Sequence, residues 1–301
     1  MLFDFENKLL SATVFSDPFP HLIIEDFLPK ELYLELQKLF EDQLFIDEMK
    51  RSNLYSQSNQ RVDIPLFDDS FFSYLSNYNN FYKTLLNKLL SDKLSYLIYK
   101  IFGENIVEHF VKGTRGKMST FDANKIRTKY RRASGIDLTE KSIDPTLYVN
   151  LNLGINTRVF GKPSSARGLH IDALNKSIAA FLYCRPDNDN HPGGDLLLCK
   201  FKTNQPRYIS HKLPDHNSCE ASKLVKYKSN CLVIFMNSVN SLHLVTPRPP
   251  TSIERRFFVF TSEFRNNVID PMPYLTEKDK KELIIPRIKL SDYGPTYINN
   301  F

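Results

Sequence analysis

The sequence of 301 residues has no tryptophan and only 10 glycines, but it has 23 phenylalanines and 15 tyrosines. These aromatic side chains can build a core without tryptophan. Because glycine is scarce, a glycine pair says more than usual about a turn or a close backbone approach. No run of about 18 apolar residues is present, which argues against a membrane-spanning helix.

Cysteine is also rare, and the four cysteines form no CxxC pair. Two of them lie in apolar, strand-like runs, so we expect free thiols in a reducing compartment. The N-terminal sequence MLFDFENKLL has no basic segment before an apolar one, which argues against a secretory signal and favours a cytoplasmic (intracellular) location. The composition, 42% hydrophobic and 25% charged, is that of an ordinary globular protein.

The net charge of +6 is modest but uneven. Eight basic residues fall between Lys112 and Arg132, against the single acid Asp122. The simpler interpretation of this stretch is a solvated surface. The alternative is a contact surface for an anionic substrate or a nucleic acid.

The first part of the chain, residues 1–143, is predicted to be mainly helical, with the basic stretch as a connecting segment. PFPHLIIEDFLPKELYLELQKLF predicts a short strand, a turn and a helix that begins near Pro29. The segment from Asp68 to Gly103 is predicted to be helical, and its part SDKLSYLIYKIFG has apolar residues at helical spacing with Gly103 as a stop.

After residue 144 the pattern changes to short apolar runs separated by turn-forming residues. The runs are TLYVNLNLG, KSIAAFLYC, GDLLLCKF, NCLVIFM, HLVTP and RRFFVFTSEF. Many short strands favour a sandwich or barrel, so residues 144–265 are predicted to form a β-rich core. Residues 266–301 are predicted to be a C-terminal extension with one short helix near residues 276–283.

The motif GLHIDA, residues 168–173, is the main candidate for chemistry. On an extended segment, His170 and Asp172 point to the same side, so imidazole and carboxylate can meet at one metal ion. His243 is the third candidate, because two histidines and one carboxylate form the facial triad of non-haem iron oxygenases. Taken alone, the HxD motif is explained equally well by a hydrogen-bonded His–Asp pair.

The order of elements after this motif strengthens the metal interpretation. One strand-like run ends at Tyr183, a loop leads to Gly193–Gly194, and His243 precedes a run that begins with Arg255–Arg256. In this order the sequence resembles the Fe(II)- and 2-oxoglutarate-dependent dioxygenases, particularly their prolyl-hydroxylase-like branch. The matching stretches are RGLHIDALNKSIAAFLYC, GGDLLLCKF, CLVIFMNSVNSLHLVTPR and ERRFFVFTSEF, within residues 145–265.

The resemblance implies an α+β protein in which a double-stranded β-helix (a cupin-like jelly roll) carries the iron and the helical N-terminal region packs on it. It implies that His170, Asp172 and His243 are metal ligands and catalytic residues. It implies that Arg256 binds the distal carboxylate of 2-oxoglutarate, with Tyr183 reaching the same molecule. Arg255 competes with Arg256, because adjacent strand residues face opposite sides.

The implied activity is oxidoreductase chemistry, a dioxygenase that hydroxylates a substrate with release of succinate and CO₂. Fe(II), 2-oxoglutarate as cosubstrate and O₂ are the implied cofactors, with ascorbate as a candidate reductant. Asp172 favours hydroxylation, since related halogenases have a small residue in its place. Two alternatives remain open: an inactive jelly-roll binding module and another cupin-type metal enzyme.

The substrate is not identified by any motif. The substrate can be a small molecule or a macromolecule, and the basic stretch favours an anionic substrate. Nucleic acid is not excluded as a partner. No membrane partner is expected. In this fold the core fixes the cosubstrate chemistry while loops select the substrate. We expect the selecting parts to be residues 1–143 and the loops 155–168, 185–193 and 203–228.

Overall fold

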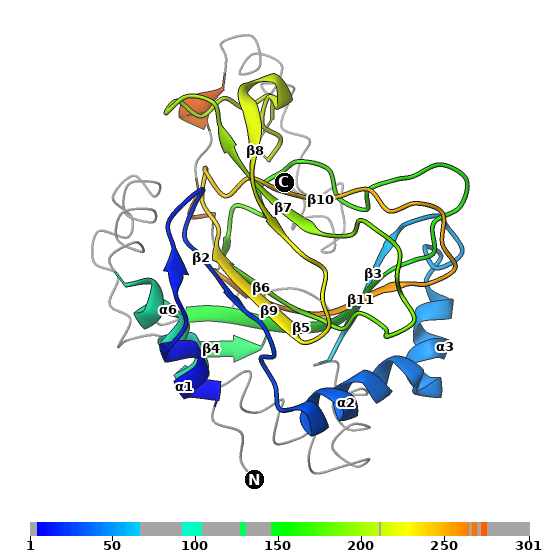
Figure 1. Cartoon of the computed structure of the whole chain (residues 1–301). Helices are drawn as coiled ribbons and strands as arrows, with labels where there is room; N and C mark the ends of the chain where they lie inside the picture. The colour runs from blue at the N-terminus through cyan, green and yellow to red at the C-terminus, as the bar shows by residue number, and fades with distance from the viewer. Residues whose placement is uncertain are drawn as a thin grey trace, which may run out of the picture.

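The computed structural model describes residues 5–66, 92–103, 127–130, 146–210, 212–264, 267–269 and 272–275. Helices and antiparallel sheets are mixed, with one sheet of eight strands and one of three (Figure 1). No helix in the described part of the chain is long and apolar enough to cross a membrane. All four cysteines are free, and three of them are buried.

The elements follow each other along the chain with the helices first and most strands later. The helices are α1 (Phe5–Leu10), α2 (Lys30–Lys38), α3 (Gln43–Arg51) and α6 (Asp92–Phe102). The strands are β1 (Val14–Phe15), β2 (His21–Ile24), β3 (Arg61–Pro65), β4 (Arg127–Tyr130), β5 (Thr146–Asn156), β6 (Lys176–Tyr183), β7 (Leu196–Phe201), β8 (Cys219–Val225), β9 (Cys231–Met236), β10 (His243–Val245) and β11 (Arg255–Glu263).

The large sheet has the order β1-β2-β9-β6-β11-β5-β3, with β4 pairing parallel to β5. The small sheet has the order β10-β7-β8 and is antiparallel throughout. Strands that are neighbours in the large sheet are often far apart in sequence, so β11 lies between β5 and β6. This crossing brings Arg255 at the start of β11 beside Asn156 at the end of β5.

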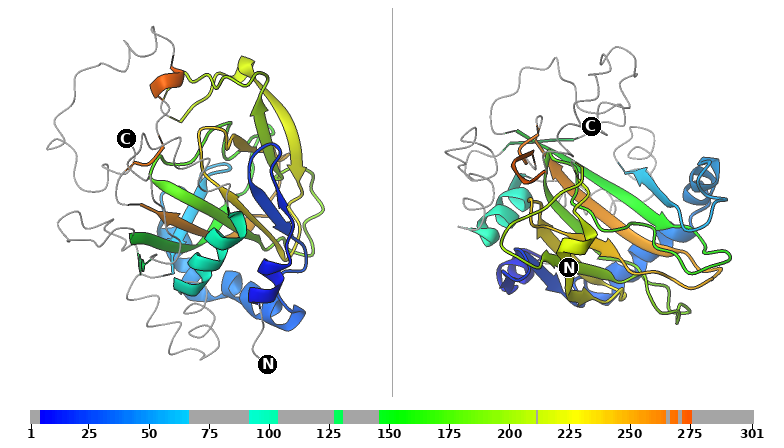
Figure 2. Two further views of the ribbon diagram at one scale, coloured as in Figure 1. Left: turned by 90° about the vertical axis from the view of Figure 1, so that its left-hand side faces the viewer. Right: turned by 90° about the horizontal axis from the view of Figure 1, so that it is seen from above.

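The large sheet buries both of its faces, because its strands alternate between two cores. On β11, Phe258 and Phe260 belong to the larger core, which also contains side chains of α1, α2, α3 and α6. Phe257 and Val259 face the other way, into a core that they share with Leu196 of the small sheet. Helices therefore cover one face of the large sheet and the small sheet covers the other (Figure 2).

The predicted strand and helices of the N-terminal region are confirmed where they are described. β2 follows the cis-proline turn at Pro18, α2 begins directly after Pro29, and α6 ends before Gly103, which has a left-handed backbone. β1 and β2 extend the large sheet, so this region contributes strands as well as helices. It shares one hydrophobic core with the sheet.

The six strands predicted after residue 144 are all present, and β1, β3, β4 and β8 were not predicted. β8 lies in a segment expected to be a loop. Three predicted features lie outside the described residues. They are the helix at residues 276–283, the part of the helical segment from Asp68 to residue 91, and the basic stretch apart from the backbone of β4.

Candidate functional site

Two segments that are far apart in sequence meet at the candidate metal centre. The backbone amide of His170 donates to the carbonyl of His243 at 3.1 Å, and the amide of His243 donates back to the carbonyl of His170 at 3.0 Å. His243 is the first residue of β10, while His170 forms a single bridge rather than part of a strand. This reciprocal pair places the two imidazole rings side by side, with centroids 4.4 Å apart.

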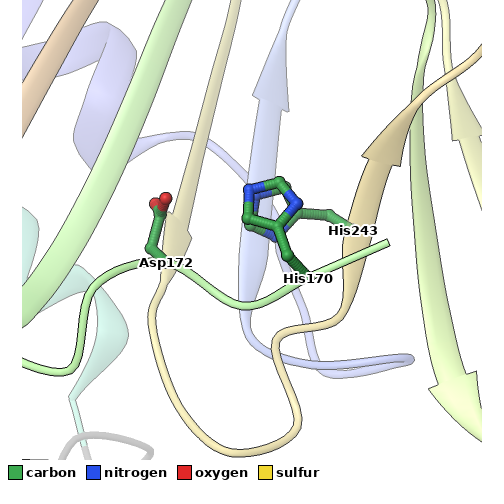
Figure 3. A group of neighbouring side chains, drawn as sticks. All are labelled: His170, Asp172 and His243. Atoms are coloured by element: carbon green, nitrogen blue, oxygen red, sulfur yellow. The ribbon is translucent and has the colours of Figure 1, made fainter. Parts of the chain in front are cut away.

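Asp172 completes a metal trio of His170, Asp172 and His243. One ligand atom of each residue lies within 4.8 Å of the others, and no other group of three such side chains is found in the described ranges. Figure 3 shows the carboxylate of Asp172 on the same side of the HxD segment as the two imidazoles, whose planes are tilted by 52° to each other. The extended backbone between residues 170 and 172 puts both side chains on one side, as the HxD spacing predicts.

Both imidazoles are oriented by backbone carbonyls. Nδ1 of His170 lies 2.7 Å from the carbonyl of Gly168, and Nδ1 of His243 lies 2.8 Å from the carbonyl of Ser241. A carbonyl only accepts, so each Nδ1 carries the proton and donates it. The lone pair is then on Nε2 in both rings, which is the arrangement that metal-binding histidines adopt.

The surroundings favour neutral imidazoles. Burial and the neighbouring His243 together lower the pKa of His170 to about 3, although Asp172 acts in the opposite direction. Burial also lowers the pKa of His243, again against Asp172. Neutral imidazole is the form that binds metal, so the protein stabilises these two groups in the protonation state that a metal needs.

The carboxylate of Asp172 is kept ionised. Burial favours its neutral form, but Lys176, His243, His170 and Arg61 together hold its pKa well below its usual range. Nζ of Lys176 lies 3.7 Å from Oδ1 of Asp172. The trio therefore offers two neutral nitrogen ligands and one anionic oxygen ligand.

The two arginines that begin β11 face opposite sides of the large sheet. Arg256 faces the helices: its guanidinium carbon lies 5.5 Å from the ring centroid of Phe40, and Nη2 lies 4.0 Å from Glu254. Arg255 faces the core between the sheets, where its guanidinium carbon lies 4.9 Å from the ring centroid of Tyr183. Because alternate strand residues point to opposite faces, only Arg255 shares a face with Tyr183.

Arg255 is a buried cation enclosed by aromatic rings. It is 3% exposed, and its guanidinium carbon also lies 4.9 Å from the ring centroid of Tyr227 and 5.0 Å from that of Phe257. Its Nε donates to the carbonyl of Gly194 at 2.7 Å, and Nη1 donates to Oδ1 of Asn156 at 3.2 Å. No carboxylate among the described residues forms an ion pair with it, which leaves a buried charge without a counterion.

The hydroxyl of Tyr183 is a second unsatisfied group in the same place. It is buried and has no hydrogen-bond partner. Burial raises the pKa of Tyr183 to about 12, although Arg255 acts against this shift. An uncompensated guanidinium next to an unsatisfied hydroxyl fits an acidic ligand, because a carboxylate can accept from both.

An aromatic row joins this region to the metal trio. The ring centroids of Tyr183 and Phe181 are 6.3 Å apart, and those of Phe181 and Phe235 are 6.2 Å apart. The ring centroid of Phe235 lies 4.8 Å from that of His243. This series of ring contacts leads from Tyr183, the ring beside Arg255, to the ring of His243.

The pair Gly193–Gly194 supports Arg255 from the loop before β7. Gly193 has φ +81°, and a Cβ atom there would lie 1.9 Å from the carbonyl oxygen of Pro247. Gly194 has φ +75° and gives its carbonyl to Arg255. The scarce glycines thus mark a close approach of two backbones, as expected from the sequence.

Comparison with solved structures finds similar architectures at low identity. The chain is similar to a prolyl 4-hydroxylase from Phytophthora capsici, with 12% identity, a TM-score of 0.41 and coverage of 88% of this chain and 66% of that one. It is similar to a prolyl-4-hydroxylase from Pseudomonas putida at 14% identity and TM-score 0.38, covering 88% of this chain and 100% of that one.

A third similar structure is an oxidoreductase of the 2OG-Fe(II) oxygenase family from Burkholderia pseudomallei, with 11% identity, a TM-score of 0.38 and coverage of 82% and 85%. No family model matches the sequence. No curated protein matches it either. At these identities and TM-scores, the case for the site rests on the arrangement of its own side chains.

Three cations near the metal trio were not singled out from the sequence. Arg61 of β3 lies over the rings of Phe257 and Phe181, at 5.2 and 5.8 Å from their centroids. Arg167 and Lys212 line a pocket together with two members of the trio, His170 and Asp172. No sequence signal marked them, because each lies in a loop or a short strand that is placed near the site only by the fold.

Two polar residues of β5 point to the interior. Asn150 and Asn152 lie on the face opposite the one that Leu151 and Leu153 bury in the larger core. Their Oδ1 atoms are buried without hydrogen-bond partners. Buried oxygens without hydrogen-bond partners favour a contact with a ligand.

Proposed function

We propose that this protein is an Fe(II)- and 2-oxoglutarate-dependent dioxygenase that hydroxylates its substrate. The observation that carries the proposal is the trio of His170, Asp172 and His243, with both Nδ1 protons donated to backbone carbonyls. Their ligand atoms lie within 4.8 Å of each other. Two imidazoles and one carboxylate suit Fe(II) and leave several coordination positions for a cosubstrate and O₂.

The second support is the buried pair of Arg255 and Tyr183. A dicarboxylate that reaches the metal with one end would present its other carboxylate to the guanidinium and the hydroxyl. This assignment gives Arg255 a counterion and Tyr183 a hydrogen-bond partner. When bound, iron and 2-oxoglutarate supply the oxidation that consumes O₂ and releases succinate and CO₂, while the protein holds and orients them.

The arrangement of the two sheets is consistent with a double-stranded β-helix. The large and small sheets face each other across one aromatic and aliphatic core, and the metal trio lies where β10 of the small sheet meets the HxD segment. We propose that residues 144–265 are the catalytic core, with the N-terminal region packed on its outer face and residues 266–301 as an extension.

The proposal is tested by loading purified protein with Fe(II) without oxygen and measuring bound iron per chain. The wild type should bind one iron, and His170→Ala and Asp172→Ala should bind less than a tenth of that amount. His191→Ala is the matched control, since His191 lies outside the trio and pairs with Asp189. Full iron occupancy in both trio variants would exclude this metal site.

The same iron-loaded preparation distinguishes the proposed dioxygenase from two alternatives, an inactive binding module and another cupin-type metal enzyme. A binding module that has lost catalysis would bind no iron in the wild type. Another cupin-type metal enzyme would bind metal but show no affinity for 2-oxoglutarate. The proposed dioxygenase should bind both, and Arg255→Gln should weaken 2-oxoglutarate binding while leaving iron binding unchanged.

A further inference from the structure

The pocket at the metal trio has a cationic rim, and this feature concerns the substrate of the proposed function. The pocket has a volume of about 590 Å³ and contains both His170 and Asp172. Arg167, Lys176 and Lys212 line it together. A pocket of this size fits a small molecule or one residue of a larger one.

The backbone fixes two of these cations beside the metal ligands. The carbonyl of Lys212 accepts from the amide of Ile171 at 3.1 Å, within the HxD motif. The carbonyl of Arg167 accepts from the amide of Val245 at 3.0 Å, at the end of β10. Both residues belong to loops, yet their positions are tied to the same two segments that hold the trio.

The acids of the pocket are already engaged. Asp63 pairs with Arg61 at 2.8 Å, and Asp172 pairs with Lys176 at 3.7 Å. Glu263 is 2% exposed and accepts from the side-chain amide of Asn175 at 3.4 Å. Within the described ranges, no carboxylate forms an ion pair with the guanidinium of Arg167 or the ammonium of Lys212.

The two cations also repel each other and their neighbours. Burial lowers the pKa of Lys212, and Lys176 and Arg167 lower it further, with Asp172 acting in the opposite direction. Neighbouring cations that form no ion pair favour an anion between them, because it reduces their repulsion and forms charge-assisted hydrogen bonds.

We propose that Arg167 and Lys212 bind an anionic group, a phosphate or a carboxylate, of a small-molecule substrate whose remaining part lies over the metal trio. This inference rests on the proposed function for its reaction but not for its binding site. The cosubstrate is assigned to a different cation, because Arg255 lies in the interior among aromatic rings, whereas Arg167 is exposed and lines the pocket.

The binding site is tested in metal-free protein by calorimetric titration with inorganic pyrophosphate and, separately, with citrate. We expect at least one of the two anions to bind, and the double variant Arg167→Gln/Lys212→Gln to bind it at least tenfold more weakly. The anion that binds more tightly indicates whether the substrate carries phosphate or carboxylate. No binding of either anion to the wild type would overturn the proposal.

The matched control is the double variant Arg51→Gln/Lys38→Gln, which also removes one arginine and one lysine charge, here from α3 and α2. Both residues are exposed and form only surface ion pairs. This control should bind the anion within twofold of the wild type. An equal weakening in both double variants would show a nonspecific charge effect and would contradict the proposal.

A charge-preserving variant guards against a folding defect. Arg167→Lys/Lys212→Arg should bind the anion within about threefold of the wild type, and circular dichroism should show the same fold for all variants. If the charge-preserving variant loses binding as completely as the double Gln variant, the two cations are not the binding groups.

Two further outcomes separate this inference from the proposed function. In iron-loaded protein, the Arg167→Gln/Lys212→Gln variant should keep its affinity for 2-oxoglutarate within twofold, and a larger loss would mean that these cations hold the cosubstrate. If iron or 2-oxoglutarate does not bind at all, the proposed function fails while the metal-free titration still tests the anion site. Binding of a single-stranded oligonucleotide tenfold more tightly than pyrophosphate would overturn the small-molecule assignment.

Discussion

The two cationic regions to which we assign the cosubstrate and the substrate are built in different ways. Arg255 is buried, enclosed by three aromatic rings and held by two hydrogen bonds to Gly194 and Asn156. Arg167 and Lys212 line the pocket from loops, and the hydrogen bonds that hold them are those of their backbones. A rigid interior cation suits a ligand that is the same in all relatives, such as a cosubstrate, whereas cations on loops suit a substrate that differs between relatives.

The largest effect is expected from the turn that supports the interior region. Gly193→Ala puts a Cβ atom against the carbonyl of Pro247 and a side chain on a left-handed backbone, so we expect a loss of about 2–4 kcal/mol in the free energy of unfolding. Urea denaturation measures this loss. Gly161→Ala is the control, because Gly161 has φ +73° but nothing within 4 Å of the added atom, so its loss should be only about 1 kcal/mol.

The assignment of the cosubstrate to the interior cation is tested by substituting each of the two arginines that begin β11. Arg255→Gln should weaken 2-oxoglutarate binding about 100-fold, or about 2.7 kcal/mol, because a carboxylate in the interior would lose its counterion. Arg256→Gln should change this affinity less than about threefold, since its side chain faces the helices. Equilibrium binding to the iron-loaded protein measures both. The opposite order of effects would restore Arg256 as the cosubstrate ligand.

A smaller effect is expected for the hydroxyl beside Arg255. Tyr183→Phe removes one hydrogen-bond donor and preserves the ring, so 2-oxoglutarate should bind about tenfold more weakly, or about 1.4 kcal/mol. Tyr208→Phe provides a control elsewhere, because the hydroxyl of Tyr208 donates to the carbonyl of Val239 in another cluster. Equal affinities of Tyr183→Phe and the wild type would remove Tyr183 from the cosubstrate site.

The smallest effect concerns pH. The pKa of His170 is lowered from 6.5 to about 3 by burial and by His243, so between these values the unfolded chain binds the proton that the folded chain rejects. The resulting stability is fully present above pH 6.5 and is lost as the pH falls towards 3. In metal-free protein, His170→Gln should reduce this slope by about 0.5 kcal/mol per pH unit, since solvent reaches the pocket. An unchanged slope would show that His170 is not desolvated.

The sequence predicted the parts of the fold that depend on regular patterns. β6, β9 and β11 are apolar runs with clear ends, and the spacing of α6 before Gly103 is helical. β3 was missed because RVDIP is short and contains a proline, and β8 because CEASKLV has no strict alternation and stays mostly exposed. Both are recognised as strands only through pairing with β5 and β7.

In the candidate site too, local spacing predicted some features, whereas others depend on long-range pairing. The spacing in HxD placed His170 and Asp172 together because neighbours at i and i+2 share a side in any extended segment. Arg255 and Arg256 were not separated, because a shift of one residue in register exchanges their faces and only the pairing with β5 fixes it. Arg167 and Lys212 could not be found, since their closeness depends on long-range backbone bonds.

The most direct test of the central claim is the release of succinate from 2-oxoglutarate by wild-type protein in air with Fe(II) and ascorbate. We predict succinate formation above the iron-only blank, even without a substrate. Asp172→Ala should form none, and Arg255→Gln should form far less than the wild type at a 2-oxoglutarate concentration that just saturates the wild type. Arg256→Gln should form succinate at close to the wild-type rate. If iron-loaded wild-type protein forms no succinate above the blank, including across a panel of phosphorylated and carboxylated small molecules, the assignment to 2-oxoglutarate chemistry is contradicted.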